Sequence, residues 1–68
     1  MDYAQQDSVE AGLRFRTPSG VVVKTTGKTT HVQSIALPKG LYVHQVEIVE
    51  GENQGSTFLH NLDYSEPM

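Results

Sequence analysis

The sequence predicts a small all-β domain built from about five short strands. The chain has 68 residues, which is enough for a single domain. β-Branched and aromatic residues recur in short runs, several of which alternate between apolar and polar side chains as half-buried strands do. Glycine and proline separate these runs about every ten residues, and both residue types favour turns.

Two strands joined by a turn are expected at the start of the domain, over residues 13–17 and 21–26. In the first strand Arg14 and Arg16 alternate with apolar or β-branched residues, which is the period of two of a half-buried strand. The second is almost entirely β-branched. The residues Pro18–Gly20 between them favour a turn, so the two strands are expected to form a hairpin.

Three further strands are expected to complete the sheet. A turn at 27–28 precedes a strand over 29–37, in which the apolar positions change phase and so indicate a bulge or bend near residues 33–34. The longest and clearest alternation covers 41–50, and a short last strand covers 56–60.

The expected domain covers residues 11–64, preceded by a flexible N-terminal arm over 1–10 and followed by a tail over 65–68. Residues 61–64 are expected to make one short 3-10 turn near the C-terminus. Because an open five-stranded sheet exposes two edges, a strongly bent antiparallel sheet closing into a small barrel is favoured. The expected core consists of Leu13, Phe15, Val21, Val23, Val32, Ile35, Leu37, Val46, Ile48, Phe58 and Leu62.

The stretch from Gly55 to Leu62, together with the strand rhythm over roughly residues 12–64, resembles an SH3-like barrel. In that fold a glycine-bounded loop, a short strand and a 3-10 turn lead to closure. The resemblance implies a fold and no particular ligand. Peptide-binding SH3 domains use an aromatic pair and a tryptophan, and this chain has no tryptophan, so recognition of proline-rich segments is not implied.

The charges are distributed unevenly along the chain. The segment 11–60 holds all five basic residues and three acidic ones, so its formal charge is +2, whereas the two ends together carry −5. No run approaches the ~20 apolar residues of a membrane span, and the polar, acidic N-terminus is unlike a secretion signal. The chain also lacks cysteine, which fits a reducing compartment. A cytoplasmic protein without a membrane partner is therefore expected.

No motif in the sequence predicts catalysis, and we expect neither an enzyme nor a cofactor. His31, His44 and His60 fall on different strands at spacings that match no metal-binding pattern, so no metal site is expected. Ser56, His60 and Asp63 are the residue types of a catalytic triad, but triads are assembled by the fold and not by closeness in sequence. A domain this small is also expected to lack a ligand pocket of about 300–1,000 Å³, and hence a small-molecule substrate.

The favoured interpretation is a noncatalytic interaction or regulatory module, such as a small bacterial or phage accessory protein, that binds a protein partner or self-associates. Obligate interfaces bury apolar residues, and three valines are expected on the strand surfaces. These candidate contact residues are Val22, Val43 and Val49.

Binding of single-stranded nucleic acid is the alternative interpretation. Arg14 and Arg16 point to one face of the first strand, and Lys24 is expected beside them on the second. Together with Tyr42 or His44, such a strip could contact a single strand through charge and base stacking. The near-neutral domain and its acidic ends argue against this alternative.

Overall fold

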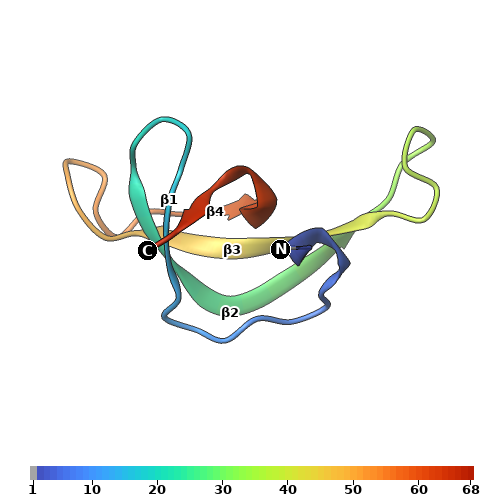
Figure 1. The fold of residues 1–68 in the computed structure, drawn as a ribbon, viewed down its shortest axis with the longest axis horizontal. Helices are drawn as coiled ribbons and strands as arrows, with labels where there is room; N and C mark the ends of the chain where they lie inside the picture. Colours follow the sequence, from blue (N-terminus) through green and yellow to red (C-terminus); the bar gives the residue numbers. More distant parts are fainter. Residues whose placement is uncertain (1) are drawn as a thin grey trace.

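The computed structural model describes residues 2–68, in which five strands form one antiparallel sheet accompanied by two short 3-10 helices (Figure 1). The elements in chain order are η1 (Tyr3–Gln5), β1 (Arg14–Arg16), β2 (Val22–Val32), β3 (Leu41–Ile48), β4 (Thr57–His60), η2 (Leu62–Tyr64) and β5 (Glu66–Pro67). The order across the sheet is β4-β3-β2-β1-β5. The predicted all-β class is confirmed, but β4 and β5 are the two edges of the sheet, so the observed pairing does not close a barrel.

The hairpin of β1 and β2 forms as predicted. Its turn is closed by the amide of Thr17, which donates to the carbonyl of Val21 (2.9 Å), and by that of Gly20, which donates to the carbonyl of Thr17 (2.9 Å). Gly20 has φ +87°, in the left-handed region that glycine adopts at little cost. The strands expected over 41–50 and 56–60 are also present, as β3 and β4.

β2 is one long strand where the sequence predicts two. The expected turn at Gly27 is a bulge: the register with β3 shifts between Thr25 and Thr29, so that residues 26–28 lie opposite the single residue Gln45. Gly27 has φ +91°, which allows the chain to bend there without leaving the sheet. A bulge bends its strand and increases the local twist, and this bend gives the sheet its strong curvature.

The strand expected over 29–37 ends at Val32, and residues 33–40 form the loop between β2 and β3. Figure 1 shows this loop, in green and yellow, extending beyond the sheet at one end of the molecule, whose longest dimension is 36 Å. The residues Val32, Ile35 and Leu37 were expected in the core but are 40%, 103% and 44% exposed. The expectation was wrong because the strand ends before Ile35 and Leu37, and because Val32, its last residue, lies at the end of the β2–β3 pair away from the core residues.

The core lies on one face of the bent sheet. Its buried residues are Phe15, Val23, Val46 and Leu62, with Tyr3, Val21 and Ile48 packed against them. Leu62 reaches the core from η2, which confirms the predicted 3-10 turn near the C-terminus. Leu13 and Phe58, two further expected core residues, are exposed at the margin.

Both ends of the described chain are part of the fold. The N-terminal segment, expected to be a flexible arm, begins with η1, and the ring of Tyr3 packs edge-on against that of Phe15 with centroids 5.3 Å apart. Met1 lies outside the described residues. The expected tail contains β5, whose Glu66 pairs with Arg16 of β1.

Candidate interaction surfaces

The basic strip lies on one face of the sheet, as predicted. Arg14 of β1 is directly opposite Lys24 of β2, and Arg16 follows on the same face of β1. Acidic residues occupy the same rows, because Glu47 pairs with Lys24 and Glu66 pairs with Arg16. Opposite charges directly across neighbouring strands attract each other and reduce the positive potential of the strip. The strip is therefore a surface of mixed charge.

His44 does not belong to this strip. Its side chain lies on the opposite face of β3 from Glu47 and is 0% exposed. Its Nε2 donates to the carbonyl oxygen of Tyr3 (3.0 Å), because a carbonyl can only accept. Its Nδ1 lies 2.8 Å from the hydroxyl oxygen of Thr29, within hydrogen-bond distance. Both ring nitrogens are thus used within the fold, and the expected contact of His44 with a ligand is wrong.

Tyr42 lies on the same face of β3 as His44 and therefore faces away from the arginines. Its ring contacts the ring of His31, with centroids 4.8 Å apart. The structure thus brings together Arg14, Arg16 and Lys24 but separates them from both residues that were expected to stack on bases.

The three valines do not form one exposed patch. Val22 is buried, at 5% exposure, and its carbonyl accepts the amide of Val49 (3.1 Å). Val43 lies further along β3, with Gln45 and Glu47 between it and Val49 on the same face. The predicted valine surface is thus incorrect as a contiguous site.

A different surface stands out at the end of the β2–β3 hairpin, here called the hairpin tip (residues 32–41). Ser34 and Leu37 exchange two backbone hydrogen bonds, from Ser34 N to Leu37 O (3.3 Å) and from Leu37 N to Ser34 O (3.1 Å). These bonds close a tight turn that places Ile35 and Ala36 at its centre. The amide of Gly40 donates to the carbonyl of the same leucine (2.8 Å).

Two side chains, one on β2 and one within the loop, hold the base of the hairpin tip. The amide nitrogen of Gln33 donates to the carbonyl of Pro38, and the His31 Nε2 lies 3.3 Å from the carbonyl of Lys39. Gly40 has φ +74°, and a Cβ there would lie 2.5 Å from the His31 ring, so no larger residue fits without a shift. These contacts define one conformation for the loop.

The hairpin tip presents apolar side chains to solvent. Turn centres usually hold glycine, asparagine, aspartate or proline, whereas this one holds the fully exposed Ile35. Residues that break such a local rule concentrate at functional sites. Val32 and Leu37 enlarge the apolar surface, and Lys39 is the one charged residue of the stretch. Sequence reasoning missed this surface because it treated these residues as core.

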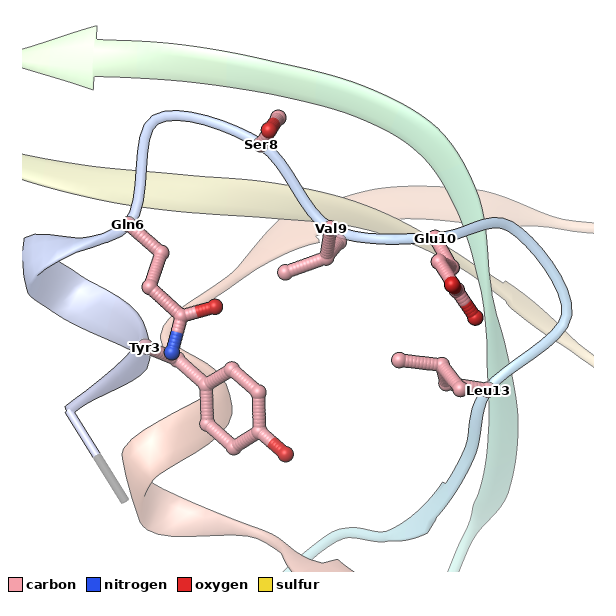
Figure 2. A pocket seen from close by; sticks show the side chains of 6 residues that line it. All are labelled: Tyr3, Gln6, Ser8, Val9, Glu10 and Leu13. Carbon is pink, nitrogen blue, oxygen red and sulfur yellow. The ribbon is translucent and has the colours of Figure 1, made fainter.

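A hollow of about 540 Å³ lies beneath the N-terminal segment (Figure 2). This N-terminal hollow is lined by Tyr3, Gln6, Ser8, Val9, Glu10 and Leu13. Figure 2 shows the side chains of Val9, Glu10 and Leu13 turned toward a common space beside the ring of Tyr3. Its volume falls in the range of ligand pockets, but the hollow is largely open to solvent.

Hydrogen bonds fasten the N-terminal segment on both sides of the hollow. The carboxylate of Asp63 accepts the amides of Tyr3 (2.8 Å) and Ala4 (3.0 Å). Further along, the hydroxyl of Thr25 donates to the carbonyl of Glu10 (2.5 Å). The segment that lines the hollow is therefore anchored at two points.

The three histidines and Asp63 have partners within the fold. Among residues 2–68, no group of three His, Asp or Glu side chains could hold a metal ion. His60 Nε2 lies 2.6 Å from the hydroxyl of Ser65, and partial burial lowers the pKa of His60. Asp63 instead binds the N-terminal segment, so these two residues are engaged separately and not with each other.

Comparison of the chain with protein-family models, with curated proteins and with solved structures gives no match. Within residues 2–68 there is also no helix with the length and apolar character needed to cross a membrane. The comparisons thus assign no family to this chain.

Proposed function

We propose that the protein is a noncatalytic interaction module that binds a protein partner through the hairpin tip. The observation that carries this proposal is the full exposure of Ile35 on a turn that two backbone hydrogen bonds already hold in shape. A loop held in its binding conformation loses little conformational entropy when a partner covers it, and this raises affinity. Lys39 favours a partner whose apolar pocket is bordered by carboxylates.

The expected energetic contribution of Ile35 follows from its exposure. Burying an isoleucine side chain that was fully exposed contributes about 1.5–3 kcal/mol. Since each 1.4 kcal/mol is a tenfold change in affinity, replacing Ile35 by aspartate should weaken partner binding by about 10- to 150-fold. An effect of this size in a single side chain is typical of the few residues that dominate an interface.

The test compares two apolar-to-aspartate variants of the tagged full chain. Ile35→Asp should lose a partner that the unaltered chain recovers in stoichiometric amount, while its melting temperature stays the same. Leu59→Asp is the matched control, because Leu59 is also exposed but lies on β4, away from the hairpin tip. Recovery of the same partner at the same yield by both variants would contradict the proposal.

Binding of single-stranded nucleic acid is a second candidate, favoured by the joint position of Arg14, Arg16 and Lys24 on one face. The acidic neighbours Glu47 and Glu66 reduce its electrostatic basis. Titration of a labelled oligonucleotide at two salt concentrations tests it. Submicromolar, salt-sensitive binding that the double variant R14A/R16A loses would favour this function over the first.

We infer further that the domain has an SH3-like barrel fold. Two features support this inference. η2 lies between β4 and β5, in the place where the resemblance expects a 3-10 turn, and the chain then returns to pair with β1. Amide contacts between β4 and β1 or β5 in nuclear magnetic resonance spectra would establish closure, and their absence would refute it.

A further inference from the structure

We propose that the N-terminal hollow of one molecule binds the hairpin tip of a second copy, so that the protein self-associates. This inference rests on the proposed function, since it uses the hairpin tip as the binding element. It adds the receiving site and the identity of the partner. Three properties of the two surfaces support it: their charge, their shape and their separation within one molecule.

The two surfaces have complementary charge. The N-terminal segment carries Asp2, Asp7 and Glu10 and no lysine or arginine, and Glu10 lines the hollow itself. From residue 11 to residue 46 the chain has no acidic residue, and the hairpin tip contributes Lys39. Complementary charges guide two surfaces together and disfavour other pairings. A basic tip therefore suits this acidic hollow better than it suits another tip.

The two surfaces also have complementary shape and polarity. The hairpin tip is a protrusion that ends in Ile35, and the hollow is a concave space of about 540 Å³. Its walls include the aliphatic side chains of Val9 and Leu13 and the ring of Tyr3 (Figure 2). An aliphatic anchor inserted into a pocket with aromatic and aliphatic walls is the usual arrangement at the centre of a strong interface.

The contact cannot form within one molecule. The side chain of His31 holds the loop 33–40 to β2, that of Gln33 bonds to Pro38 within the loop, and Figure 1 shows the loop pointing away from the N-terminal segment. The contact therefore joins two copies through different surfaces. Such an interface either repeats reciprocally across a two-fold axis or continues from one copy to the next as a ring or chain.

The experiment is sedimentation velocity on the purified full chain, from about 10 µM to about 1 mM, at low and high salt. The expected result is a sedimentation coefficient that rises with concentration and falls with salt, because exposed charge pairs are screened. Ile35→Asp and Val9→Asp should each abolish the concentration dependence while the melting temperature stays unchanged. A protein that remains monomeric at every concentration would overturn the inference.

Charge reversal tests the pairing of the two surfaces directly. Glu10→Lys and Lys39→Glu should each weaken self-association roughly threefold to tenfold, the scale expected for exposed ion pairs turned repulsive. The double variant E10K/K39E should restore it, whereas Glu52→Lys, in the β3–β4 loop, should leave it unchanged. A double variant as weak as the single ones would refute the pairing.

The two proposals can fail separately. A monomeric chain whose Ile35→Asp variant loses a stoichiometric partner of another sequence would retain the proposed function and exclude self-association. Self-association that is insensitive to Ile35→Asp but lost in Val9→Asp would exclude the hairpin tip from self-association and leave the proposed function to the recovery experiment.

Discussion

Replacing the buried His44 by phenylalanine should destabilise the domain by about 3–5 kcal/mol. The imidazole bonds to η1 through the carbonyl of Tyr3 and to β2 through the hydroxyl of Thr29. A phenylalanine of similar shape keeps the packing but forms neither hydrogen bond, so the carbonyl of Tyr3 and the hydroxyl of Thr29 lose their partner. Two lost hydrogen bonds contribute about 1 kcal/mol each, and a buried polar group left without a partner costs about 1–3 kcal/mol more.

Thr29→Val provides the control that isolates the hydrogen bond from the packing. Alone it should cost about 1 kcal/mol, but in the His44→Phe background it removes a hydroxyl that no longer has a partner. The two effects should therefore be less than additive, by about 1 kcal/mol, as residues in direct contact are in double-mutant cycles. His44→Gln, which keeps one donor, should fall between the wild type and His44→Phe.

The assay is urea unfolding followed by far-ultraviolet circular dichroism. A domain this small has a total stability of about 3–5 kcal/mol, so His44→Phe should be close to unfolded in water while Thr29→Val remains folded. The reasoning would be refuted if His44→Phe changed stability by less than about 0.5 kcal/mol, or if the two substitutions were additive.

Three further predictions concern other contacts. Asp63→Ala should destabilise the domain by about 1.5–3 kcal/mol, because it removes a charged acceptor of two amides, and hydrogen exchange in residues 2–10 should accelerate; unchanged exchange would contradict this. Gly40→Ala should cost about 1–2 kcal/mol from its positive φ alone and weaken binding through the hairpin tip, as calorimetric titration of the partner would show. Burial lowers the pKa of His60, so the unfolded state binds its proton more readily; stability should fall as pH drops through 6.5, and His60→Gln should flatten the urea midpoint against pH.

Local signals explain the elements that were predictable from the sequence. The alternation around Phe15 and the proline and glycine of the turn that follows it define the first hairpin, and both signals lie within a few residues of each other. The alternation over 41–50 correctly places Val46 inward and Glu47 outward. The predicted first hairpin also correctly brings Arg14 and Lys24 to one surface.

The errors arise where distant residues decide the outcome. A glycine with positive φ serves a turn and a bulge equally well, and only pairing with Gln45 shows that Gly27 is a bulge. Likewise, nothing near Tyr3 in the sequence indicates that Asp63 will bind its amide. Ile35 was assigned to the core because apolar residues usually lie inside. That tendency does not account for a turn that holds an apolar side chain in solvent.

The contact between Tyr3 and Asp63 has a consequence for the order in which the chain folds. It joins residues 60 positions apart in the sequence, and β5 also pairs with β1, so much of the final structure depends on contacts between distant segments. Pairings between distant segments slow folding, because the chain loses entropy before the contacts form. The β1–β3 region can assemble as soon as it is made, whereas the N-terminal segment has no place to dock until residue 63 has emerged. Docking of the N-terminal segment is therefore expected to be a late step in the folding of this domain.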